Sequence, residues 1–264
     1  MHLLTEKYKP ILCTPFGRDG YRETAPCAAL SPYIRCFWTE REIERDLLVI
    51  PDTCMDIIFR IDGTENSGFF CTIDENSFYS ANGDSELFGV RFYAWTAHLF
   101  AKRDFTGSKN LAFPTEEFFG NLGAELAPYI ASAKTFEERA AAAENALLKR
   151  LDGICADNNL LNAIDLIIDN HGSLEISELC AHTTLSARTL ERTFAAAIGI
   201  SPKAFSSLVR YQLLWQEMIS RPDLNILDAV EKYGYADQPH LLNDFRRRHL
   251  MNPKQAIDYA INRG

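Results

Sequence analysis

The chain has 264 residues, 47% of them hydrophobic, and carries 27 Lys and Arg against 36 Asp and Glu for a formal net charge of −9. This length suits one or two domains, and the hydrophobic content excludes a mostly disordered chain. No apolar run approaches the ~18–20 residues of a membrane span, and the N-terminus lacks the apolar stretch of a signal peptide. We therefore expect a soluble, cytoplasmic protein with no membrane partner.

The acidity is distributed unevenly along the chain. Residues 160–264 carry 11 Lys and Arg against 12 Asp and Glu, a net charge of −1, which leaves −8 for the rest. A net charge of −9 argues at first against nucleic acid as a partner, because phosphate contacts need Lys and Arg. That argument applies to residues 1–159 and does not apply to the near-neutral C-terminal part.

Residues 1–115 have the pattern of a β-rich domain. Short apolar runs rich in β-branched and aromatic residues lie at 47–50, 55–61, 68–73 and 87–92. Clusters of turn-forming residues at 62–68 and 80–84 separate them. This alternation predicts an antiparallel sheet or a small barrel.

Residues 116–157 have a helical pattern dominated by Ala, Leu, Glu and Lys. We expect one helix after Thr115 that Pro128 interrupts, and a second from Thr135 to Arg150. The best candidate for a linker is the run 157–159. An apolar stripe in the second helix could pack on its own domain or pair with a second copy of the chain; its members are Ala142, Ala146, Leu147 and Leu151.

From Leu160 onward the signals are helical throughout. Helix starts and stops predict seven short helices, at 160–170, 174–182, 186–198, 202–220, 226–233, 237–249 and from 253 onward. The chain as a whole is therefore expected to be α+β: a β-rich domain at 1–115, a helical linker at 116–157, and an all-α domain at 158–264.

One pattern occurs twice among these helices: a short helix, a turn of three or four residues, and a second helix. Leu190 and Phe194 in the first copy, and Leu241 and Phe245 in the second, give each second helix one apolar face. Ser186 and Asp237 are suitable N-caps. The opposite faces carry side chains that pair with base edges in the major groove. The candidate DNA-binding residues are Ser186, Arg188, Thr189, Glu191, Arg192, Gln238, His240, Asn243, Arg246 and Arg247.

The spacing of the two copies also fits DNA. The connecting helix at 202–220 would be ~28 Å long at ~1.5 Å per residue. With the width of the flanking helices, this approaches the ~34 Å of one DNA turn, so one chain could place two recognition helices in successive major grooves.

Residues 160–264 resemble the DNA-binding domain of the AraC/XylS family of bacterial transcription regulators. The resemblance rests on the runs at 186–192, 199–205, 234–241 and 244–247, and the N-terminal half resembles the companion domain of one subgroup at 30–34, Trp38, 50–57 and 89–92. The chain departs from the family where His249 and Leu250 replace the usual Phe and Gly, and where Asn243 replaces a common Arg. The resemblance implies a promoter-binding regulator with a companion domain that senses an effector or mediates dimerisation.

Five residues of the N-terminal half are candidates for an effector site, which rests on the resemblance: Trp38, Asp52, Asp56, Arg91 and Tyr93. A structural ion-pair network or a place in the core are the plainer interpretations of the same residues. We expect no metal site, no cofactor and no catalytic residues, since no ligand spacing, phosphate loop or nucleophile motif is present. The seven cysteines are scattered and odd in number, which favours free thiols in a reducing compartment.

Double-stranded promoter DNA is the expected partner. RNA polymerase, a small-molecule effector and a second copy of the chain are further candidates. The alternative from another functional class is a small-molecule-binding or enzymatic N-terminal domain, with the helical domain retained for dimerisation.

Overall fold

The computed structural model describes residues 2–15, 19–41, 46–61, 67–70, 77–80 and 86–262. Residues 71–73 of the strand expected at 68–73 lie outside these ranges. Most residues of the two turn-forming clusters, at 62–68 and 80–84, also lie outside them. Among the helices of the described part, none is long and apolar enough to span a membrane. No disulfide joins any of the six cysteines that the structure describes.

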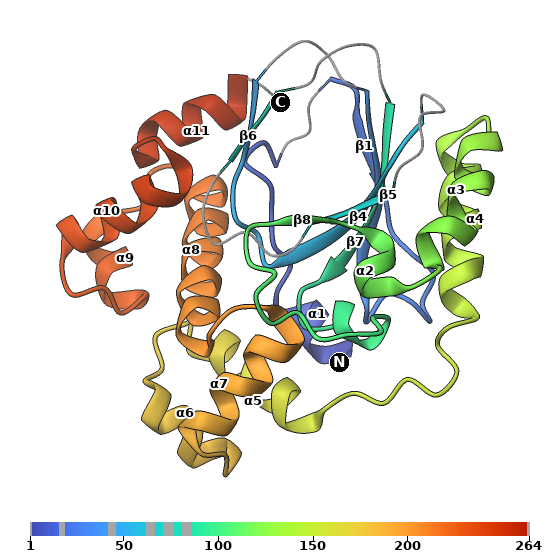
Figure 1. Ribbon diagram of the computed structural model, residues 1–264. Helices are drawn as coiled ribbons and strands as arrows, with labels where there is room; N and C mark the ends of the chain where they lie inside the picture. The colour runs from blue at the N-terminus through green and yellow to red at the C-terminus, as the bar shows by residue number, and fades with distance from the viewer. Residues whose placement is uncertain are drawn as a thin grey trace.

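The N-terminal half is built on an antiparallel sheet of six strands in the order β1-β2-β7-β4-β5-β8. A second pair, β3-β6, lies apart from it (Figure 1). The strands are β1 (Tyr21–Thr24), β2 (Ile34–Arg41), β3 (Asp46–Val49), β4 (Cys54–Arg60), β5 (Ser67–Phe70), β6 (Ser77–Ser80), β7 (Glu86–Tyr93) and β8 (Ala112–Pro114). The four expected apolar runs are found as β3, β4, β5 and β7, so the expected β-rich half is confirmed.

The α-helices other than α1 follow the sheet in chain order. A short N-terminal helix, α1 (His2–Lys7), and a 3-10 turn, η1 (Ala97–Leu99), belong to the N-terminal half. The middle helices are α2 (Thr115–Phe119), α3 (Leu122–Ser132) and α4 (Phe136–Leu148), and α3 and α4 stand together at one side of the sheet (Figure 1). Thr135 caps α4 through a capping box with Glu138, as its position before an acidic first turn predicts.

Two expectations for this middle region are wrong. Pro128 lies inside a continuous α3 and does not interrupt it. The helix continues because Leu126 and Ile130 on either side are buried in the core, while Pro128 is exposed, so the carbonyl that loses its partner can face water. Asp157 does not belong to a linker either: its carboxylate accepts the N–H of Asn159 and caps the next helix.

The C-terminal helices follow the predicted order closely. They are α5 (Asn158–Asp169), α6 (Ile176–Thr183), α7 (Ala187–Ile198), α8 (Pro202–Ser220), α9 (Ile226–Lys232), α10 (Gln238–His249) and α11 (Pro253–Asn262). The long helix α8 lies between α5–α7 at one end and α9–α11 at the other (Figure 1).

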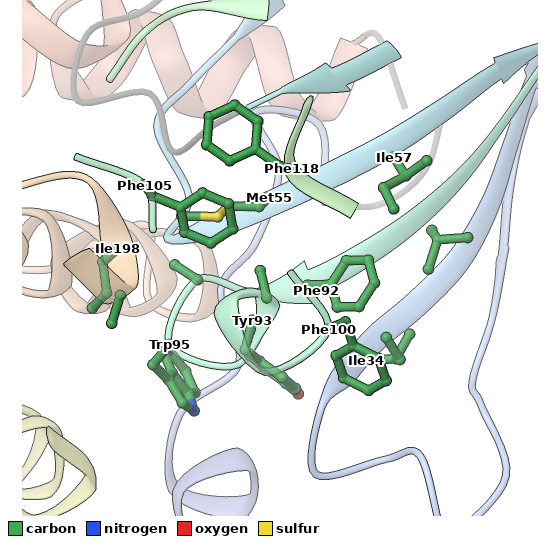
Figure 2. Packing of buried hydrophobic residues seen from close by; sticks show 14 of the residues in the cluster. Ile34, Met55, Ile57, Phe92, Tyr93, Trp95, Phe100, Phe105, Phe118 and Ile198 are labelled. Carbon is green, nitrogen blue, oxygen red and sulfur yellow. The ribbon is translucent and has the colours of Figure 1, made fainter. Parts of the chain in front are cut away.

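The main hydrophobic core runs without interruption from the sheet into the C-terminal helices. Figure 2 shows Ile198 of α7 in the same cluster as Trp95 and Phe105 from the segment after β7. Trp95 also meets Phe205 of α8 edge to face, with ring centroids 6.3 Å apart. The apolar stripe of α4 packs on this core as well, with Leu147 fully buried.

A second core holds the remaining helices together. It contains the inner face of α8 and residues of α9, α10 and α11, and it also contains Cys13, Leu48 and Ile50 from the N-terminal half. Both cores thus mix residues from before and after position 158.

Candidate nucleic-acid interface

The first helix-turn-helix unit consists of α6, a turn and α7. Glu175 begins α6 through a capping box with Glu178, and the Ser186 hydroxyl begins α7 by accepting the N–H of Thr189 at 3.1 Å. Thr184, between the helices, has φ +58°, a left-handed conformation that turns the chain sharply. Leu190 and Phe194 are fully buried, which fixes α7 with its other face outward.

The outward face of α7 carries the predicted residues. Ser186, Arg188, Glu191 and Arg192 are exposed, and Thr189 is half-buried. The hydroxyls of Thr189 and Ser186 lie 2.9 Å apart and hydrogen-bond to each other. Within the described part of the chain, Arg188 and Arg192 make no side-chain hydrogen bond or ion pair, so their guanidinium groups are available for a partner.

The second unit repeats this arrangement with α9, a turn and α10. Asn225 caps α9, and Asp237 caps α10 by accepting the N–H of His240 at 2.7 Å. Gly234 in the turn has φ +63°, and a Cβ there would lie 2.8 Å from Cβ of Ser173. Glycine is therefore needed twice over, for its conformation and for the close approach of the α5–α6 loop.

The predicted residues of α10 also face outward. Gln238, His240, Asn243, Arg246 and Arg247 are all exposed. Two are already engaged: the His240 ring accepts the N–H of Ala236, and Arg247 donates to Asp244 at 3.3 Å. Gln238, Asn243 and Arg246 make no such contact with the described residues.

A buried polar network joins α10 to α8. Arg248, fully buried, donates to Ser207 of α8 at 2.7 Å and to Asp244 at 3.3 Å. Asp244 also accepts the hydroxyl of Tyr235, whose ring lies under the guanidinium of Arg210 at 4.9 Å. None of these residues was among the predicted site residues. Helical phase could have separated Arg248 from its two neighbours, because it lies on the face of Leu241 and Phe245.

Four of the five effector candidates come together on the sheet face opposite the main core. The Arg91 guanidinium lies 3.0 Å from Asp56 and 3.7 Å from Asp52, and the Trp38 indole donates to Asp56 at 2.6 Å. The side chains of Arg91, Asp56 and Asp52 keep 13–16% exposure. Tyr93 lies apart in the main core, where its ring stacks on Trp95 (Figure 2).

Burial and charge act against each other in this cluster. Burial raises the pKa of Asp52, against the lowering effect of Arg91. Burial by itself would lower the pKa of Arg91, yet Asp56 and Asp52 hold it well above its ordinary value. Burial also raises the pKa of Tyr93 to about 12. Arg91, Asp56 and Asp52 thus form a mostly buried ion-pair network.

Comparisons with known proteins find a family model for part of each half of the chain. Residues 179–258 match the family model of a helix-turn-helix domain (HTH_18), and residues 22–111 match a domain of unknown function (DUF6597). A search of the curated proteins finds no match. Among solved structures, the chain is similar to ToxT from Vibrio cholerae at 12% identity, over 84% of this chain and 98% of that one, with a TM-score of 0.44. A ToxT structure bound to (E)-4-(8-methylnaphthalen-1-yl)but-3-enoic acid is similar at 10% identity, over 85% and 99%, with a TM-score of 0.46.

Proposed function

We propose that this DNA-binding transcriptional regulator, which carries an AraC-type helix-turn-helix domain, reads its operator with two recognition helices, α7 and α10. The observation that carries the proposal is the repeated unit. Each copy has a capped second helix, a buried apolar face and an outward face with unpaired Arg, Gln or Asn side chains. A single outward face of this kind is ordinary for an amphipathic helix. Two such faces, joined by α8, form a repeated surface.

The length of α8 supports binding to successive grooves. Its 19 residues span ~28 Å at ~1.5 Å per residue, and it separates the two units. Adding the width of the helices at its ends approaches the ~34 Å of one turn of B-DNA. The expected operator therefore has two half-sites ~10 base pairs apart on one face of the duplex.

Roles for individual side chains follow from their exposure and chemistry. Arg188, Arg192 and Arg246 suit guanine, with two N–H donors for O6 and N7, while Gln238 and Asn243 suit adenine. Glu191 can accept from cytosine N4, and His240 and Arg247 are exposed on α10 beside Asn243. Ser186 and Thr189 stand at the N-terminus of α7, where backbone N–H groups favour a phosphate.

The N-terminal domain is proposed to sense an effector or to mediate dimerisation. The cluster of Trp38, Asp52, Asp56 and Arg91 supports an effector site, because its charged groups gather on one sheet face and keep some exposure. Tyr93 is no part of that cluster, so its assignment has only the family resemblance behind it. A second copy of the chain and RNA polymerase are also proposed as partners, and these two proposals likewise rest on the family resemblance.

Selection of genomic DNA by the purified full-length chain tests the proposal. We expect enrichment of fragments, including the region upstream of the chain's own gene, that share two half-sites ~10 base pairs apart. Selection with and without a metabolite extract tests the effector at the same time. Enrichment of a single half-site, or of no sequence, would contradict the two-helix assignment.

A further inference from the structure

The N-terminal strap, residues 8–14, packs against both the sheet domain and the second helix-turn-helix unit. At its start, the Tyr8 hydroxyl lies 3.0 Å from the Thr53 hydroxyl beside β4. At its end, Cys13 is buried in the second core, with α8 and α10. The strap therefore connects the N-terminal domain to the unit farthest from it in the sequence.

Gln212, on α8, is the main polar link to the strap. Its side chain is fully buried and makes three hydrogen bonds: it accepts from the Ile11 N–H at 2.9 Å and donates to the carbonyls of Ile11 at 3.2 Å and Pro51 at 2.8 Å. The neighbouring Trp215 donates its indole N–H to the Leu12 carbonyl at 3.0 Å. Two successive turns of one face of α8 are thus bonded to the backbone of the N-terminal half.

His249, the last residue of α10, makes the corresponding link for the recognition helix. Its Nε2 lies 3.4 Å from Cys13 Sγ of the strap and its Nδ1 lies 2.8 Å from the hydroxyl of Tyr211 on α8. Its ring stacks on Phe245, with an interplanar angle of 6° and centroids 4.9 Å apart, and meets Trp215 edge to face. Phe, which the resembled family usually has here, could supply the ring contacts but neither of the polar ones.

These links lie on the side of α10 opposite the residues proposed to contact bases. Phe245 and His249 face inward, while Gln238, Asn243 and Arg246 face outward. A shift of the strap would therefore move the outward face without touching any residue proposed to contact bases. The first unit is attached separately, because the Phe105 N–H donates to the Ala196 carbonyl of α7 at 2.8 Å.

We propose that Gln212, which ties α8 to the strap and to Pro51, and His249, which ties α10 to Cys13 of the strap, are positioning residues. Through them the N-terminal domain fixes the distance and rotation between the two recognition helices. The inference rests on the proposed function, since it concerns the geometry of reading two half-sites. Its consequence is specific: the strap decides which spacing between half-sites the protein accepts.

The test measures spacing discrimination by the full chain. Two Kd values are measured, one for the selected operator and one for the same operator with one base pair inserted between its half-sites. The Kd ratio is the second value divided by the first. One base pair moves the second half-site by ~3.4 Å and rotates it around the helix axis, which a fixed α10 penalises. Gln212→Leu removes all three links to Ile11 and Pro51 and puts an apolar side chain of similar size in the place of the amide. We expect it to lower the ratio by about tenfold.

Two further variants separate positioning from loss of structure. Gln216→Leu is the same substitution one turn along α8, at a side chain whose Nε2 has no hydrogen-bond partner, and should keep the wild-type ratio. His249→Phe keeps the ring stack on Phe245 but loses the polar contacts to Cys13 and Tyr211. It should therefore lower the Kd ratio, as Gln212→Leu does.

Each outcome is informative. Weaker binding of Gln212→Leu to both DNAs with an unchanged ratio would show a structural role only, and would overturn the inference. Failure of the wild-type chain to select any two-part operator would instead count against the proposed function. If Gln212→Leu does not fold, the ratio for His249→Phe decides the matter alone.

Discussion

The indole of Trp38 lies directly over Gly89 on the neighbouring strand, in the space that any side chain at position 89 would need. A Cβ on Gly89 would lie 2.0 Å from Cε2 of Trp38. Gly89→Ala must therefore displace the indole, and with it the hydrogen bond to Asp56. We expect a loss of about 2–3 kcal/mol in the free energy of unfolding, measured by urea denaturation.

Gly153→Ala is the matched control for this prediction. Gly153 has φ +82° and nothing within 4 Å of a built Cβ, so the variant suffers backbone strain alone, about 1 kcal/mol. Equal effects of the two substitutions would show that Trp38 moves aside easily and that the crowding at Gly89 has little energetic weight.

Leu250→Gly should stabilise the protein. Leu250 ends α10 with φ +57°, a left-handed conformation that glycine adopts without steric cost. Its side chain is 49% exposed, so little apolar burial is lost. We expect a gain of about 0.5–1 kcal/mol and a higher Tm. Leu227→Gly, at a leucine 62% exposed inside α9, should cost about 1 kcal/mol instead. A fall in Tm for Leu250→Gly would contradict the strain argument.

Acid should destabilise the protein through His249. Burial lowers its pKa to about 3, whereas a histidine in the unfolded chain titrates near 6.5. Between these values the unfolded state binds the extra proton, so the free energy of unfolding falls as the pH falls. The wild-type chain should lose about 2 kcal/mol more than His249→Phe between pH 7 and pH 5. Parallel pH profiles for the two proteins would show that His249 is protonated in the folded state.

Binding to non-operator DNA should be weak and only moderately sensitive to salt. Residues 160–264 carry nearly balanced charge, and Arg248 is buried away from any phosphate. Few counterions are released, so log K should fall with log salt more gently than for a basic domain. Titration of random-sequence duplex between 50 and 200 mM salt measures this. A slope as steep as −8 to −10 would mean that far more phosphates are contacted than this surface offers.

The bounds of the C-terminal helices could be predicted from the sequence more closely than their packing. Ser186 and Asp237 indicate where the recognition helices begin, because an N-cap is a local signal. The helical period then distinguishes the buried residues of each helix from the exposed ones. Pro128 misled because its effect depends on tertiary support, which Leu126 and Ile130 supply.

Long-range contacts were beyond a sequence pattern. Nothing in the run at 8–14 signals that its backbone will bond to Gln212, some two hundred residues later. An ion-pair network was one of the interpretations of Asp52, Asp56 and Arg91, and the pairing of β4 with β7 brings the three side chains together. Tyr93 lies two residues after Arg91, so strand alternation alone would place it beside the cluster. At the end of β7 its ring instead stacks on Trp95 of the main core, a contact that the sequence pattern does not signal.

The most direct test of the two-helix account is the affinity of Arg192→Ala for the selected operator. We expect a loss of about 1–3 kcal/mol, confined to the intact operator and absent on a duplex whose α7 half-site is scrambled. Arg22→Ala, at an exposed arginine paired with Glu137 on the N-terminal domain, should bind as the wild type does. Unchanged operator binding by Arg192→Ala, or equal losses on both duplexes, would contradict base reading by α7.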